Sequence, residues 1–201
     1  MRKVLLSLVV VSLVAIPVFA GKYNKVITVG QKAPDFSGLP AVSNGEDSSL
    51  TLSDLKEDVV VLVFLGNHCP VVQAYEDRLI DFTNDYKDKG VRVVGVSVND
   101  LDSDRIPKIK EYMKDHKSNY IYGYDESQAT GKAYGAVVTP QFFVLDKERK
   151  IRYTGAMDDS QNEARVKKTY LRDAVNAVLK GETPAKDETQ ARGCGVKYKR
   201  S

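Results

Sequence analysis

A continuous apolar run, Val59–Leu65, constrains the fold of this chain more than any other feature. Its seven residues are rich in Val and too few for most helices, so the run predicts a β-strand buried on both faces. After Pro70 the apolar residues recur at spacings of three and four, from Val72 to Tyr86, which is the stripe of an amphipathic helix. A buried strand followed so closely by a helix predicts the start of an α/β unit.

The same alternation continues along the chain. Val91–Val98 predicts a second buried strand, and the apolar positions within Ile106–Met113 predict a second helix. Strands alternating with helices imply parallel pairing through right-handed crossovers. Gln141–Leu145 and Ile151–Thr154 predict an antiparallel pair, because only a short polar turn joins them. We therefore expect an α/β fold with a mixed central sheet flanked by helices.

The remaining segments carry weaker patterns. Residues 29–49 predict an extended, loop-rich stretch, and Ala164–Lys180 predicts the last helix. The segment Glu182–Ser201 is mostly polar and has no hydrophobic period, so we expect a loose tail that adds little to the core. A hydrophobic content of 42% suffices for one core without disulfide staples, which favours one domain over residues 21–181 and a separate tail.

Residues 1–20 are typical of a secretion signal. Arg2 and Lys3 precede the apolar run Val4–Phe19, which leads to Ala20 at the expected cleavage position. An uncleaved membrane anchor is the alternative, and the Ser and Pro residues that interrupt this short run disfavour it. We expect a periplasmic or secreted protein with no stable membrane insertion after cleavage, in a compartment where thiols oxidise.

Charge and ligand counts exclude several classes of function. The formal charge is +3, and it falls to +1 without Arg2 and Lys3, so we expect no binding of nucleic acid. Two cysteines and two histidines are too few for a structural zinc site. A metal held by His68 and Cys69 would need a further thiol or histidine nearby, and we predict no metal.

Cys69 lies where the first buried strand gives way to a helix, with Pro70 in the first helical turn. The unpaired amides and the dipole of a helix N-terminus favour a thiolate there. A protonated His68 would lower the pKa of the thiol further. A buried, unreactive cysteine is the alternative interpretation, and we favour a redox role because the residue sits at the carboxyl edge of a parallel sheet.

Thr139 and Pro140 immediately precede the predicted strand Gln141–Leu145. A proline at the start of a strand is usually part of a trans turn. A cis bond beside Cys69 is the alternative, and it would leave the preceding backbone free to pair with an extended substrate. Thr139 and Pro140 are therefore candidate substrate-binding residues.

Taken together, these motifs resemble the thioredoxin-like superfamily, and within it the redoxin branch of AhpC/TSA and peroxiredoxin-like proteins. The resemblance covers nearly the whole chain after residue 20 and is carried by Val29-Gly30, Ala33-Pro34-Asp35-Phe36, Leu52-Ser53-Asp54-Leu55, Asn67-His68-Cys69-Pro70-Val71 and Thr139-Pro140-Gln141-Phe142-Phe143. The Asn-His-Cys-Pro motif and the closing Gly193-Cys194-Gly195-Val196-Lys197 are similar to an exported peroxiredoxin-like subgroup. This resemblance implies a thioredoxin-like fold and thiol-dependent redox chemistry.

The residues around Cys69 depart from each well-known activity of that superfamily. Aligning Phe64–His68 with the thioredoxin motif puts Cys69 at the first cysteine and Val72 at the second, so the usual pair of neighbouring thiols is missing. Peroxiredoxins carry Thr three residues and Pro seven residues before their cysteine, where this chain has Gly66 and Leu62. Glutathione peroxidases use a Trp, which this sequence lacks.

Cys194 is the only other thiol in the sequence. The 13 residue steps from Gly181 span at most about 45 Å, and the domain should be about 40 Å across, so Cys194 can reach Cys69. Glycines on both sides would let the tail bend toward Cys69. Three arrangements remain open: a pair that cycles, a static disulfide that fastens the tail, and two unrelated thiols.

We predict an exported thiol-disulfide oxidoreductase that needs no dissociable cofactor. Cys69 would attack a protein or small-molecule disulfide, or less readily a peroxide, and Cys194 would resolve the adduct. An external dithiol would supply the electrons. The alternatives are a peroxiredoxin-like thiol peroxidase with an antioxidant role and a non-catalytic binding module with a static disulfide.

Overall fold

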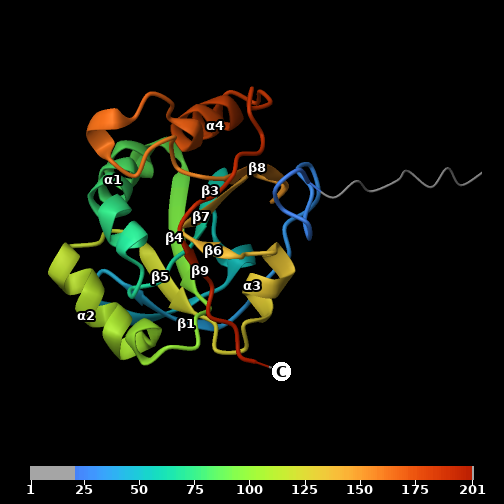
Figure 1. The fold of residues 1–201 in the computed structure, drawn as a ribbon. Coiled ribbons are helices and arrows are strands. Elements are labelled where there is room, and N and C mark those ends of the chain that lie inside the picture. The colour runs from blue at the N-terminus through green and yellow to red at the C-terminus, as the bar shows by residue number, and fades with distance from the viewer. Residues whose placement is uncertain (1–20, 201) are drawn as a thin grey trace, which may run out of the picture.

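A computed structural model gives the structure of this protein and describes residues 21–200, so the expected secretion signal lies outside the described residues. A seven-stranded sheet forms its centre, and helices cover both faces (Figure 1). The strand order is β2-β1-β5-β4-β3-β7-β8. The strands of this sheet are β1 (Leu39–Ser43), β2 (Glu46–Leu50), β3 (Val59–Phe64), β4 (Val91–Ser97), β5 (Ile121–Tyr124), β7 (Gln141–Leu145) and β8 (Ile151–Gly155).

Pairing within the sheet is mixed, which confirms the predicted fold class. Strands β3, β4 and β5 run parallel, whereas β7 pairs antiparallel with both β3 and β8. At the other edge, β1 pairs antiparallel with β5 and β2. A second, two-stranded sheet joins β6 (Val138–Thr139) to β9 (Cys194–Gly195). The short sheet lies beside the carboxyl ends of the parallel strands, where the candidate site forms.

Helices pack on the sheet according to which face each strand residue presents. The helices are α1 (Pro70–Tyr86), α2 (Ile106–His116), α3 (Ala129–Tyr134) and α4 (Tyr170–Leu179). Val61 and Val63 of β3 pack in one core with α1, α2 and α4, whereas Val60 and Leu62 pack in the other with α3 (Figure 1). None of the helices in residues 21–200 is long and apolar enough to cross a membrane.

The structure contains short elements that the sequence did not predict. The stretch interpreted as a loop contains the β1–β2 hairpin, whose turn residues Asn44 and Gly45 have φ of 51° and 80°. Positive φ at both positions is what a two-residue hairpin turn requires. Strand β2 is almost wholly exposed and carries no buried face for a pattern to reveal. Strand β5 and helix α3 were also missed, because four and six residues are too few to show a period.

The last helix is shorter than predicted. Helix α4 begins at Tyr170 rather than at Ala164. The side chain of Asn162 accepts a hydrogen bond from the backbone N–H of Ala164 and starts a separate 3-10 turn, Glu163–Arg165. The chain then leaves helical geometry at Val166, whose φ and ψ are −65° and 125°. A local side-chain cap has therefore divided what looked like one helical segment.

The tail is docked along the molecule, so the expectation of a loose segment was wrong. In Figure 1 it runs from α4 past β9 to the C-terminus. Thr189 N–H donates to the carbonyl of Thr154 at 3.0 Å. Further along, Lys197 N–H donates to Asn99 Oδ1 at 2.9 Å, and Lys199 N–H donates to Gln128 Oε1 at 2.8 Å. Backbone hydrogen bonds of this kind require no hydrophobic period, which is why the sequence pattern missed them.

Glu188 joins the tail to the start of the described chain. Its carboxylate accepts three consecutive backbone N–H groups, from Lys22 at 2.6 Å and from Tyr23 and Asn24 at 2.7 Å. Hydrogen bonds to a carboxylate are stronger than those to a neutral acceptor. Glu188 therefore holds the N-terminal segment against the tail.

We expect the Glu188→Gln variant to lower the free energy of unfolding by about 1 to 2 kcal/mol, because one acceptor loses its charge and the other becomes a donor facing N–H groups. Urea unfolding followed by circular dichroism measures the difference. Glu182→Gln is the matched control, since the Glu182 side chain makes no hydrogen bond within residues 21–200. Equal midpoints for the two variants would contradict a stabilising role for Glu188.

Candidate active site

The two cysteines form a disulfide. Cys69 and Cys194 are separated by 125 residues in the sequence, and their Cα atoms lie 5.8 Å apart. Cys69 is completely buried, whereas Cys194 is partly exposed. Of the three arrangements that the sequence left open, this geometry removes the one with two unrelated thiols.

Cys69 occupies the junction between β3 and α1. It is the N-cap residue of α1, and Pro70 takes the first helical position. The backbone N–H of Cys69 donates to the carbonyl of Gly66 at 3.0 Å, which closes the turn between strand and helix. The helix terminus favours a thiolate at this position, whereas complete burial opposes the charge. Reactivity in the reduced protein therefore depends on how far the covering residues move aside.

Thr139 and Pro140 lie directly against Cys69. The Thr139–Pro140 peptide bond is cis, and Cys69 Sγ lies 3.2 Å from the carbonyl oxygen of Thr139. Thr139 belongs to β6, and Pro140 leads into β7, which pairs with β3 just before the junction. The sheet thus brings together the two segments that sequence analysis selected.

The tail reaches the surroundings of Cys69 as a β-strand. In the β6–β9 pair, Thr139 lies opposite Cys194 and Val138 lies opposite Gly195. The backbone N–H of Val196 donates to the carbonyl of Val137 at 3.0 Å, which extends the pairing by one residue. Cys194 therefore reaches Cys69 from an extended strand laid along β6.

His68 is held by a buried carboxylate. Its Nδ1 lies 3.0 Å from Asp104 Oδ2, and Asp104 is fully buried. Because a carboxylate accepts hydrogen bonds, the nitrogen that faces Asp104 is suited to act as the donor of this contact. Nε2 is buried and has no hydrogen-bond partner within the described part of the chain. No group of three or more His, Cys, Asp or Glu side chains in residues 21–200 is placed to hold a metal ion.

The sequence analysis did not select Asp104, and it named Gly66 only as the residue in place of the peroxiredoxin Thr. A Cβ added to Gly66 would lie 2.8 Å from His68 Cε1 and 2.9 Å from Asp104 Oδ2, so a side chain there would disturb the His68–Asp104 pair. Asp104 follows β4, which lies parallel and adjacent to β3. The carboxyl ends of neighbouring parallel strands lie at the same edge of a sheet. The acidic segment after β4 could therefore have indicated that a carboxylate lies near His68.

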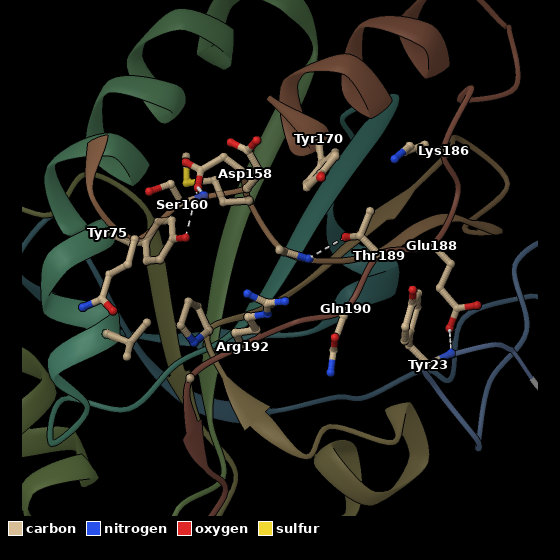
Figure 2. A pocket seen from close by; sticks show the side chains of 17 residues that line it. Tyr23, Tyr75, Asp158, Ser160, Tyr170, Lys186, Glu188, Thr189, Gln190 and Arg192 are labelled. Atoms are coloured by element: carbon tan, nitrogen blue, oxygen red, sulfur yellow. Dashed lines mark hydrogen bonds between the residues drawn. The ribbon is translucent and has the colours of Figure 1, made fainter. Parts of the chain in front are cut away.

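A cavity of about 610 Å³ lies beside Pro140 and Gly193, next to the disulfide. Figure 2 shows Tyr75, Asp158 and Tyr170 around it, with Arg192 of the tail opposite. The hydroxyl of Tyr75 donates to Asp158 Oδ1 at 3.0 Å. Burial and the neighbouring Asp158 raise the pKa of Tyr75 to about 12, so its hydroxyl stays neutral at physiological pH. The cavity combines the aromatic rings of Tyr75 and Tyr170 with the Asp158 carboxylate, and Gly193 on its rim directly precedes Cys194.

Comparison with known proteins gives a consistent assignment. Thiol-disulfide oxidoreductase ResA of Bacillus subtilis is 27% identical over 168 residues, which cover 83% of each chain. The solved structure of an uncharacterized conserved protein from Geobacillus kaustophilus has a TM-score of 0.81 and 33% identity, over 89% of this chain and 96% of that one. A hypothetical protein from Sinorhizobium meliloti has a TM-score of 0.79 and 32% identity, over 89% of this chain and 98% of that one. Residues 29–154 match the AhpC/TSA family model, and because this match spans more than half of the sequence, the chain belongs to the AhpC/TSA family.

Proposed function

We propose that this protein is a thiol-disulfide oxidoreductase in which Cys69 attacks a substrate disulfide and Cys194 resolves the resulting adduct. The observation that carries this proposal is the Cys69–Cys194 bond, formed at a helix N-terminus between residues 125 positions apart. The similarity to proteins named thiol-disulfide oxidoreductase supports the same class of reaction.

Each step exchanges one sulfur-sulfur bond for another. The Cys69 thiolate attacks one sulfur of the substrate disulfide, and the other substrate sulfur leaves as a thiolate. Cys194 then attacks Cys69 Sγ in the mixed disulfide, releases the reduced substrate and leaves the Cys69–Cys194 bond. An external dithiol reduces that bond and is itself oxidised to a disulfide. The cycle needs no dissociable cofactor.

Neighbouring residues support the attacking thiol in this proposal. His68 directly precedes Cys69, and Asp104 orients its ring through Nδ1. In its protonated form the ring would favour the Cys69 thiolate by its charge. Pro70 starts the helix whose dipole favours the thiolate. Thr139 and Pro140 provide the wall and the backbone edge against which a substrate lies.

We also propose that the protein is exported and that residues 1–20 are removed. A long-range disulfide suits an oxidising compartment such as the periplasm or the extracellular space. The domain then comprises residues 21–181, and residues 182–201 form the tail that carries Cys194.

The static-disulfide alternative is tested by stoichiometry. Protein reduced with dithiothreitol and freed of excess reductant is mixed with oxidised glutathione. Cycling should release two equivalents of glutathione and restore the Cys69–Cys194 bond, which peptide mapping detects. A bond that dithiothreitol does not reduce in the folded protein, or a reduced protein that releases no glutathione, would favour the static alternative.

Peroxide reduction is the second candidate, since the AhpC/TSA family model matches this chain. We expect the reduced protein to react with a small disulfide at least ten times faster than with hydrogen peroxide. The reason is that Gly66 and Leu62 stand where peroxiredoxins carry Thr and Pro, so the site lacks donors that position a peroxide. Competing the two oxidants for limiting reduced protein gives the ratio directly, and a preference for peroxide would reverse the order of the two functions.

A further inference from the structure

We propose that the tail occupies the binding site of an extended polypeptide substrate, so that tail and substrate exclude each other. The site takes a segment whose reacting cysteine directly follows a glycine, as Cys194 follows Gly193. This inference rests on the proposed function and adds the class of substrate and the competition for its site.

The first observation is the edge that the tail covers. Strand β6 pairs with no strand other than β9 within residues 21–200, so only the tail pairs with the backbone of this strand edge. When the tail leaves, the carbonyl of Val137 loses its partner, the N–H of Val196. An unpaired strand edge is a template for another extended chain. The same edge carries Thr139, whose carbonyl oxygen touches Cys69 Sγ, so a chain bound there presents its cysteine to the attacking sulfur.

The second observation sets the requirement for glycine. A Cβ built on Gly193 would lie 1.9 Å from the carbonyl oxygen of Thr139 and 2.7 Å from its carbonyl carbon. Both are backbone atoms, and no rotamer change removes them. A Cβ on Gly195 meets nothing within 4 Å. A substrate bound in the register of the tail therefore needs glycine before its cysteine, whereas the residue after the cysteine is free to vary.

The third observation explains how the tail can leave without unfolding. Residues 190–193 make no hydrogen bond in the described structure, although Thr189 before them and Lys197 after them are both bonded. Residues 190–196, called the strap from here on, are held between these two anchors by the disulfide, by the short β6–β9 pairing and by the packing of Val196 against the core. Reduction removes the covalent link, and the strap can then lift while both flanking anchors stay in place.

The strap also covers the cavity. The wall of the cavity that belongs to the domain combines two kinds of side chain. Val71, Tyr75, Pro140, Met157 and Tyr170 form its apolar and aromatic part, and residues 158–161 form a polar part that includes Asp158. Residues that precede the glycine of a bound substrate would cross this wall, as Arg192 and Gln190 do in the tail (Figure 2). Reduction thus exposes a groove for an extended polypeptide rather than a pocket for a single small group.

The exchange balances in atoms and electrons. With the strap lifted, the Cys69 thiolate attacks the sulfur of the bound substrate cysteine, and the second substrate sulfur leaves as a thiolate. The tail then displaces the substrate strand, and Cys194 attacks Cys69 Sγ. The substrate cysteine leaves as a thiolate and takes up a proton. The substrate disulfide has gained two electrons, which the Cys69 and Cys194 thiols have supplied.

The test uses the full-length, reduced Cys194→Ser variant and two synthetic peptides. One has the sequence Gln-Ala-Arg-Gly-Cys-Gly-Val-Lys of residues 190–197, and the other has Ala in place of the Gly before the cysteine. Each cysteine is activated as a 2-thiopyridyl disulfide, and released thiopyridone reports the attack by Cys69. We expect the glycine peptide to react at least tenfold faster, with glutathione as a control thiol that treats both peptides alike. Equal rates at Cys69 would overturn the glycine requirement.

A second pair of variants tests the competition. Adding Gly193→Ala to Cys194→Ser should prevent the tail from fitting and raise the rate of the glycine peptide severalfold, whereas adding Gly195→Ala should change it little. A rate that Gly193→Ala leaves unchanged or lowers would overturn the exclusion. The small disulfide 2,2′-dithiodipyridine distinguishes a failure of the proposed function from a failure of this inference alone. If it does not react with Cys69, the proposed function fails, and if it reacts while the peptides are not distinguished, only this inference fails.

Discussion

Replacing Cys194 by Ser is expected to make the mixed disulfide on Cys69 persist about 100-fold longer than in the intact protein. A thiol tethered beside the adduct acts at an effective concentration of about 1 mM or more, far above that of a dilute external thiol. The tail holds Cys194 opposite Thr139, directly beside Cys69, so its removal takes away the fastest way out of the adduct. The first attack by Cys69 should be unaffected.

Non-reducing gels and intact mass measure this adduct after the reduced variant meets a disulfide-bonded substrate protein. Cys69→Ser is the control that should form no adduct. Losing a cross-link over 125 residues removes up to about 5 kcal/mol in the chain-entropy model, so the comparison is made well below the unfolding temperature of the variant. If adducts decay equally fast with and without Cys194, an external thiol resolves them and Cys194 has another role.

The sequence predicted the elements whose signals are local. The run Val59–Leu65 contains β3, which ends at Phe64, and each residue of the run packs in one of the two hydrophobic cores beside the sheet. The stripe from Val72 to Tyr86 formed the buried side of α1. Strand β2 was not predicted because it is almost wholly exposed, and helix α3 was not predicted because it has only six residues. A period appears only where one side of a sufficiently long segment is buried.

The site was predictable residue by residue but not as an arrangement. Cys69, Thr139 and Cys194 were each selected from their neighbours in the sequence, and the fold places them in contact. The pairing of Asp104 with His68 joins residues 36 positions apart, and no local pattern specifies it. The docking of the tail combines backbone hydrogen bonds, which nearly every residue can make, with contacts of the Glu188 and Tyr198 side chains to residues far away in the sequence. Contacts of that kind are decided by tertiary structure.

Gly193 makes a tertiary contact of this kind, with the backbone of Thr139. Its backbone approaches the carbonyl of Thr139 so closely that a methyl group would overlap the oxygen atom. Gly195, two residues away on the same strand, has open space at the corresponding position. Neither glycine has a positive φ among the described residues, so an alanine at either position is compatible with the local backbone. The two substitutions therefore differ in the contact with Thr139 and little else.

We expect Gly193→Ala to weaken formation of the Cys69–Cys194 disulfide by about 10- to 100-fold, and Gly195→Ala to change it by less than about twofold. Inserting a methyl group into a packed contact typically costs about 1 to 3 kcal/mol, and about 1.4 kcal/mol corresponds to a factor of ten. Equilibration of each variant in glutathione redox buffers, followed by acid quenching and mass analysis, gives the equilibrium constant. Alanine restricts the undocked tail equally in both variants, so that effect cancels in the comparison. If the two variants close with equal constants, the tail does not need its close approach to Thr139, and the disulfide forms from a looser arrangement than the strand pairing along β6.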